Sequence, residues 1–128
     1  MSLATLATVS PSRGLISRDN YYKRIYAKTA SLFEMTSRAS AMVSPVDDGM
    51  IESMRDFGYQ VGMAFQIVDD ILDFNGEQAA VGKPLGSDLH NGLVTLPAIF
   101  YAEANPDDAD VLSLPNGGWT NTENMTRL

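Results

Sequence analysis

The 128-residue sequence has no cysteine and only one histidine, and its basic residues are a minority. Without cysteine, a disulfide framework, a Cys-ligated zinc or iron–sulfur site and a thiol nucleophile are excluded, and a single histidine leaves little for a His-rich metal centre. Nine basic against sixteen acidic residues give a net charge of −7. That balance argues against nonspecific binding of nucleic acid, which requires a basic face.

Long hydrophobic runs are also missing. No apolar stretch approaches the roughly 20 residues that cross a bilayer, and residues 1–14 lack the basic-then-apolar order of a secretion signal. We therefore expect a soluble, cytoplasmic protein whose chemistry comes from carboxylates, hydroxyls and a few lysines.

The pattern that is present is helical. Apolar residues recur at three- and four-residue steps from Asp19, which is a candidate N-cap, and again in residues 47–74 and 95–104. Gly58 and Gly62 lie four positions apart in the long second helix and would allow close helix contact. No segment shows convincing strand alternation. The sequence predicts an all-α protein.

The predicted organisation has three parts. Residues 1–18 form a flexible lead-in, residues 19–104 a helical domain, and residues 105–128 a partly disordered tail. Within the helical domain, residues 75–91 are expected to form a loop, because glycine and proline cluster there.

The most informative segment reads GMAFQIVDDILD and ends the long second helix. Helical spacing places Asp69, Asp70 and Asp73 on adjoining parts of one face, where three anions repel each other unless a cation or hydrogen-bond donors offset them. A solvated acidic edge is the alternative interpretation, but the neighbouring side chains are apolar. Carboxylates without histidine or cysteine favour Mg²⁺, with Mn²⁺ as a second choice. A calcium-binding EF-hand loop is excluded, because its first and twelfth positions would be Ile71 and Gly82.

Other polar residues accompany this segment. Gln66 shares the face with the aspartates, although a buried glutamine with ordinary hydrogen bonds would look the same. Lys28 and Thr29 lie in the middle of the first helix, where a solvated lysine is the usual case. Lys83 in the glycine-flanked loop is a candidate phosphate ligand, and Asp88 is a candidate acceptor that orients a lysine or a metal-bound water.

Several motifs together resemble one family. FQIVDDILD, followed by GKPLGSDL and GLVTLP, resembles the second aspartate-rich region of all-trans polyprenyl diphosphate synthases, and the upstream KTASLF resembles that family's Lys-Thr helix. The resemblance covers about residues 20–104. It implies an antiparallel helix bundle of the isoprenoid synthase type, a homodimer in the full-length form, and magnesium-dependent condensation of an allylic prenyl diphosphate with isopentenyl diphosphate. GKPLGSDL looks more like the medium- or long-chain synthases than the animal farnesyl enzymes.

The resemblance also implies a role for each metal-site residue. Asp69, Asp70 and Asp73 would hold Mg²⁺ against the allylic diphosphate, with Asp69 as the direct ligand.

The remaining site residues follow from the same resemblance. Lys28 and Lys83 would contact the diphosphate, while Thr29 and Gln66 would line the site near the reacting centre. Asp88 corresponds to the aspartate of the Gly-Lys loop.

The chain departs from the family in its size. Members run to roughly 300 residues with two facing aspartate-rich clusters, whereas this chain has one, so it resembles the C-terminal half of a synthase, and alone it is expected to be inactive. One alternative is a non-catalytic, diphosphate-binding partner subunit of a complete synthase. Another is a class I terpenoid cyclase, against which the GKPLGSDL and TLP elements argue.

Overall fold

The computed structural model describes residues 17–75 and 86–113, and every regular element in these ranges is helical. The predicted all-α class is therefore confirmed for the described part of the chain. The elements in chain order are α3 (Arg18–Ile25), the π-helix η1 (Tyr26–Ala30), α4 (Ser31–Met42), α5 (Asp48–Leu72), α6 (Ser87–His90), α7 (Leu96–Ala104) and α8 (Ala109–Ser113).

The chain divides into two compact units. Unit 2 is one continuous stretch, Tyr22–Asp69, whereas unit 1 combines Met1–Tyr21 with Asp70–Leu128. The boundaries fall inside α3 and α5, so both helices begin in one unit and end in the other.

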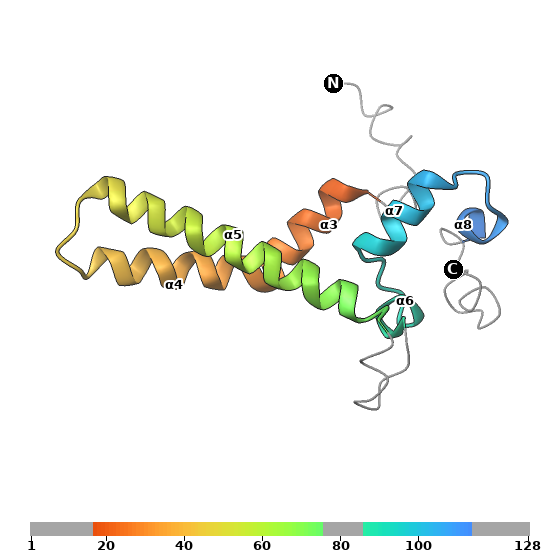
Figure 1. Cartoon of the computed structure of the whole chain (residues 1–128), viewed down its shortest axis with the longest axis horizontal. Helices are drawn as coiled ribbons and strands as arrows, with labels where there is room; N and C mark the ends of the chain where they lie inside the picture. Colours follow the sequence, from red (N-terminus) through yellow and green to blue (C-terminus); the bar gives the residue numbers. More distant parts are fainter. Residues whose placement is uncertain (1–16, 76–85, 114–128) are drawn as a thin grey trace, which may run out of the picture. The chain divides into compact units, whose positions relative to one another are not determined.

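Unit 2 is built around an antiparallel pair of helices, α4 and α5 (Figure 1). Gly58 of α5 faces α4, and Gly62 faces the end of η1 and the start of α4; at both positions the smallest side chain is required. A Cβ at Gly58 would lie 2.5 Å from the Phe33 carbonyl oxygen, and one at Gly62 would lie 2.6 Å from the Ala30 Cα. The close approach expected from these two glycines is thus observed. Next to it, the rings of Phe33 and Phe65 pack with their centroids 5.7 Å apart.

The long helix begins where its sequence indicates. Asp47 precedes α5, and its Oδ1 accepts a hydrogen bond from the Met50 amide at 2.8 Å. This bond satisfies one of the amides that have no partner at a helix N-terminus. The predicted span of residues 47–74 agrees with the observed Asp48–Leu72 within two residues.

The first helical run differs from the prediction in two ways. Asp19 is not the N-cap, because α3 already begins at Arg18 and the Ser17 carbonyl accepts the hydrogen bond of the Tyr21 amide. In addition, the run is not a single α-helix, since Tyr26–Ala30 adopts the wider π-helical turn. Such turns occur mostly as short interruptions of α-helices and often at functional sites.

Unit 1 buries aliphatic side chains from its short helices and from the segment between α6 and α7. These are Leu89, Val94, Leu96, Ile99 and Val111. The helix predicted for residues 95–104 is confirmed as α7, with extended Thr95 before its first residue and proline in its first turn.

Two further helices occupy segments that were expected to be irregular. The predicted loop of residues 75–91 contains α6, which follows Gly86 in the left-handed conformation at φ 66°. The predicted tail contains α8, which Asp108 caps by accepting a hydrogen bond from the Asp110 amide at 2.8 Å. The described part of the predicted tail, residues 105–113, thus contains one short helix, while residues 114–128 lie outside the described residues, as does most of the predicted lead-in.

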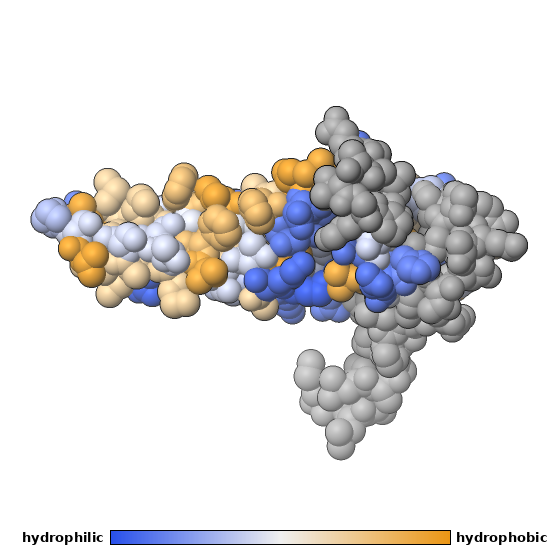
Figure 2. Space-filling view, turned by 90° about the horizontal axis from the view of Figure 1, so that it is seen from below, coloured by the Kyte–Doolittle hydropathy of each residue, from blue (hydrophilic) through white to orange (hydrophobic). Residues whose placement is uncertain are grey.

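Large apolar side chains are exposed along one side of α5. The apolar face of α5 consists of residues that recur at helical spacing and are each between 38% and 58% exposed, namely Met50, Phe57, Val61, Phe65 and Val68. Figure 2 shows hydrophobic residues spread over the surface of the long helices. In the described ranges, no helix combines the length and apolar character needed to span a membrane.

Candidate functional site

Unit 2 brings together two residues that the sequence places 37 positions apart. The Thr29 hydroxyl donates a hydrogen bond to Oε1 of Gln66 at 2.7 Å. Thr29 belongs to the π-helical turn, and Gln66 on α5 is only 3% exposed. The turn and the buried amide thus hold each other in place.

The hydrogen bonds continue from Gln66 to the acidic end of α5. Nε2 of Gln66 donates to Oδ2 of Asp69 at 3.4 Å, across the three-residue spacing that makes helix neighbours. Because its oxygen receives the Thr29 hydroxyl and its nitrogen faces the carboxylate, the amide has one defined orientation. Thr29, Gln66 and Asp69 form a continuous polar chain within unit 2.

Lys28 directly precedes Thr29 in the π-helical turn, and its side chain is exposed. Within the ranges that the structure describes, its ammonium has no hydrogen-bond or ion-pair partner. Lys28 is therefore available to an anionic ligand.

In unit 1, Asp70 is held by a residue that the sequence pattern does not single out. The Tyr21 hydroxyl donates a hydrogen bond to Oδ2 of Asp70 at 2.6 Å, and the two residues are 1% and 2% exposed. The sequence offers one signal for Tyr21 as a site residue, namely its position seven residues, or about two helical turns, before Lys28.

Asp73 makes a different set of contacts in unit 1. Its Oδ2 accepts a hydrogen bond from the Asp88 amide at 3.0 Å, and its carbonyl accepts one from the Gly86 amide at 2.9 Å. Asp73 is 6% exposed and ties the end of α5 to the start of α6. Asp88 thus contacts the acidic segment through its main-chain amide. Lys83, the other candidate from this part of the sequence, lies outside the described residues.

The three aspartates of the motif consequently differ in how accessible their carboxylates are to a ligand. Asp70 and Asp73 are buried and hydrogen-bonded to their own unit, whereas Asp69 is exposed. Among the described residues, no three acidic or histidine side chains form a ready-made metal site. The donors fit a magnesium ion of the usual kind, which takes one or two protein carboxylates and completes its shell with water and substrate phosphate oxygens.

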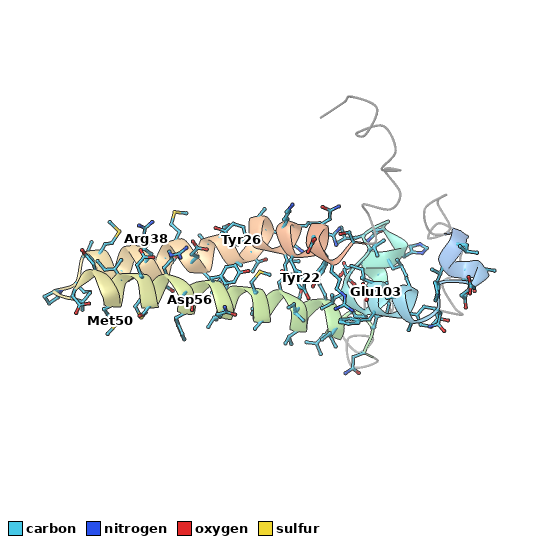
Figure 3. The ribbon with its side chains drawn as sticks, turned by 90° about the horizontal axis from the view of Figure 1, so that it is seen from above. Tyr22, Tyr26, Arg38, Met50, Asp56 and Glu103 are labelled. Carbon is cyan, nitrogen blue, oxygen red and sulfur yellow. The ribbon has the colours of Figure 1, made fainter. Side chains whose placement is uncertain are left out.

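An open cavity of about 350 Å³ lies elsewhere in unit 2. Its lining combines two tyrosines with charged side chains, namely Tyr26, Glu34, Arg55, Asp56 and Tyr59. A hydrogen bond to Glu34 raises the pKa of the Tyr26 phenol, and the Arg55 pKa is raised by its hydrogen bond to Glu52. Figure 3 labels Tyr26 and Asp56 on the helices that contribute to this lining.

The fold and the site define a class of protein. It is an all-α protein in which a turn that contains Lys28 and Thr29 is hydrogen-bonded to a long helix, and this helix ends in an aspartate-rich segment. The chain belongs to the polyprenyl synthetase family, whose match covers residues 6–125.

Several relatives are similar to this chain at about 40% identity. The solanesyl-diphosphate synthase 2, chloroplastic, of Oryza sativa subsp. japonica is 39% identical over 97 residues, which are 76% of this chain and 24% of that protein. The heptaprenyl diphosphate synthase component 2 of Bacillus subtilis is 43% identical over 100 residues, with coverages of 78% and 28%. The decaprenyl-diphosphate synthase of Dictyostelium discoideum is 40% identical over 95 residues, with coverages of 74% and 21%. The chain thus spans about a quarter of the length of these relatives, and no solved structure matches it.

Proposed function

We propose that the chain provides part of the site of a prenyltransferase that condenses an allylic prenyl diphosphate with isopentenyl diphosphate. The product would be a longer all-trans polyprenyl diphosphate. The observation that carries the proposal is the polar chain of Thr29, Gln66 and Asp69, which joins two of the motifs on which the family resemblance rests. The family match and the names of the relatives support the same reaction class.

The proposed roles follow from exposure and charge. Asp69 is the exposed carboxylate of the motif and would be the direct ligand of Mg²⁺, or of Mn²⁺ in its place. Asp70 and Asp73 would assist from their hydrogen-bonded positions. Lys28 would bind the diphosphate from the π-helical turn, and Lys83, which lies outside the described residues, would bind it as well, as the family resemblance implies.

The reaction requires charge stabilisation rather than a protein nucleophile. Ionisation of the allylic C–O bond leaves a carbocation and a diphosphate anion. The double bond of isopentenyl diphosphate then attacks this carbocation, and the new carbocation loses a proton to the released diphosphate. A bound magnesium ion would supply neutralisation of the leaving diphosphate as its charge develops. Lys28 adds a positive charge to the same task. Thr29 and Gln66 hold their polar atoms in fixed directions beside Asp69.

The relatives also bear on product and assembly. They are named for solanesyl, decaprenyl and heptaprenyl products, which supports the long-chain type that GKPLGSDL indicates. A homodimer in the full-length form remains part of the proposal, and the name "component 2" of the Bacillus relative supports a multi-chain assembly. A cytoplasmic location also remains a prediction, since the rice relative is named as chloroplastic. The alternative of a purely non-catalytic partner subunit is not retained, because the Lys-Thr, glutamine and aspartate elements occur together.

The test is magnesium-dependent binding of inorganic diphosphate, measured by calorimetry on the 128-residue chain. We expect saturable binding in the presence of Mg²⁺ and none with a chelator. The variant Asp69→Asn should weaken the binding at least about tenfold. Asp56→Asn, which removes an exposed carboxylate from the same helix, is the control and should bind as the unaltered chain does. Absence of magnesium-dependent uptake, or an unchanged affinity in Asp69→Asn, would contradict the proposal.

Prenyl transfer itself is expected to be absent from this chain alone, because it carries a single aspartate-rich cluster. Robust magnesium-dependent product formation by pure, mass-verified chain would contradict that expectation.

A further inference from the structure

We propose that Tyr21 is a positioning residue of the diphosphate site and that it acts through Asp70. The inference rests on the proposed function, because it assigns a role toward the acidic end of α5. It concerns a residue outside the Lys-Thr, glutamine and aspartate motifs that define the site.

The contact between the two side chains is short and buried. The Tyr21 hydroxyl and Oδ2 of Asp70 are 2.6 Å apart, within the range of hydrogen bonds from a hydroxyl to a carboxylate anion. Such bonds are stronger than neutral ones, and their strength grows where water is excluded. At 1% and 2% exposure, neither residue is accessible to bulk water. The bond therefore fixes the carboxylate plane of Asp70.

The start of α3, which carries Tyr21, is held in place by contacts within unit 1. Arg18, one turn earlier in α3, forms an ion pair with Glu103 of α7, and its guanidinium lies 4.1 Å from the centroid of the Phe100 ring. The Tyr21 amide bonds to the Ser17 carbonyl at 3.0 Å. The phenol thus projects from a helix start that is anchored within unit 1.

The effect on the site follows from the position of Asp70 in the motif. Asp70 directly follows Asp69, the proposed metal ligand, and precedes Asp73 by three residues. A carboxylate at this point stabilises a bound cation only when its oxygen atoms are held toward that cation. Removal of the phenol donor removes this buried hydrogen bond, so that the Asp70 carboxylate is held less firmly in its direction.

The experiment compares two tyrosines that each donate to an aspartate in unit 1. Tyr21→Phe keeps the buried ring but removes the donor to Asp70, whereas Tyr101→Phe removes the donor to Asp108, at 3.2 Å. Each variant of the 128-residue chain is titrated with inorganic diphosphate at several Mg²⁺ concentrations, well below its melting temperature. We expect Tyr21→Phe to bind about tenfold more weakly and to need more Mg²⁺ for half-saturation, while Tyr101→Phe binds like the unaltered chain. A purely structural role would lower the melting temperature of Tyr21→Phe and leave the affinity of the folded protein unchanged, and that result would overturn the inference.

A double-mutant cycle tests whether the effect passes through Asp70. If it does, adding Tyr21→Phe to Asp70→Asn should cause little further loss of affinity, because the partner is already altered. Fully additive losses would overturn the inference. If the unaltered chain takes up no diphosphate, the proposed function itself fails. If the unaltered chain binds and Tyr21→Phe binds equally well, only the role of Tyr21 is disproved.

Discussion

Gly62 of α5 lies so close to Ala30 that a Cβ at Gly62 would sit 2.6 Å from the Ala30 Cα. Backbone atoms cannot yield at that distance, so the absence of a side chain at Gly62 sets the separation of the two helical segments. The same close approach allows the Thr29 hydroxyl, one residue before Ala30, to reach the Gln66 amide.

Gly62→Ala should therefore destabilise the chain even though alanine is the better helix former. Overpacking costs about 1–3 kcal/mol, and the gain in helix propensity returns about 1 kcal/mol. We expect the free energy of unfolding in urea to fall. Gly49→Ala is the control, because its nearest neighbour is the Asp47 side chain at 3.3 Å, and its stability should be unchanged or higher. Equal stability of the Gly62→Ala variant and the unaltered chain would refute the close-contact argument.

Thr29→Val should lower stability by about 1 kcal/mol, because it preserves shape and removes a hydrogen bond to a buried amide. Thr36→Val is the matched control. Among the residues that the structure describes, the Thr36 hydroxyl bonds only to the Leu32 carbonyl within its own helix, at 2.7 Å, and Thr36 is exposed. Chemical denaturation of both variants measures the difference. A larger loss in Thr36→Val than in Thr29→Val would be the opposite of what this bond predicts.

Alkaline pH should weaken the contact between Tyr101 and Asp108. The hydrogen bond to Asp108 raises the pKa of the Tyr101 phenol above its ordinary value of 10.0. The folded state therefore favours the protonated phenol. Its stabilising contribution is complete below pH 10.0 and is lost as the pH rises through the folded-state pKa. Unfolding measured across this range should show a steeper loss of stability in the unaltered chain than in Tyr101→Phe. Parallel pH profiles would contradict the assignment.

The apolar face of α5 should bind a hydrophobic dye in the folded chain. Contiguous exposed apolar surface of this kind is uncommon on soluble monomers and takes up apolar ligands. We expect a double variant with lysine at Phe57 and Val68 to lose at least about half of the fluorescence enhancement of a naphthalene sulfonate dye. Gln60→Lys, at an exposed polar position of the same helix, should not. Near-ultraviolet circular dichroism checks that all proteins are folded, and undiminished dye binding by the folded double variant would count against the prediction.

Local signals explain what the sequence predicted well. Asp47 caps α5, proline opens α7, and two glycines four apart mark the close helix contact. The family resemblance implies that Thr29 and Gln66 line one site, which stays a prediction, and the structure joins the two side chains by a direct hydrogen bond.

Features that depend on distant residues were not predicted. Tyr21 and Asp70 are 49 positions apart, and no local pattern links them. Asp73 was expected to serve as a metal ligand, and nothing near it in the sequence indicates that its carboxylate would also receive the Asp88 amide. The π-helical turn likewise leaves no mark on a periodicity that is read in steps of three and four residues.

The division of unit 1 between both ends of the chain has a consequence for the order of events during synthesis. The contacts of unit 2 join residues such as Thr29 and Gln66, so this stretch is complete once residue 69 has left the ribosome. Arg18 precedes this stretch but pairs with Glu103, 85 positions later. Synthesis must therefore pass Glu103 in α7 before this contact of Arg18 can form, and by then all of unit 2 has been made.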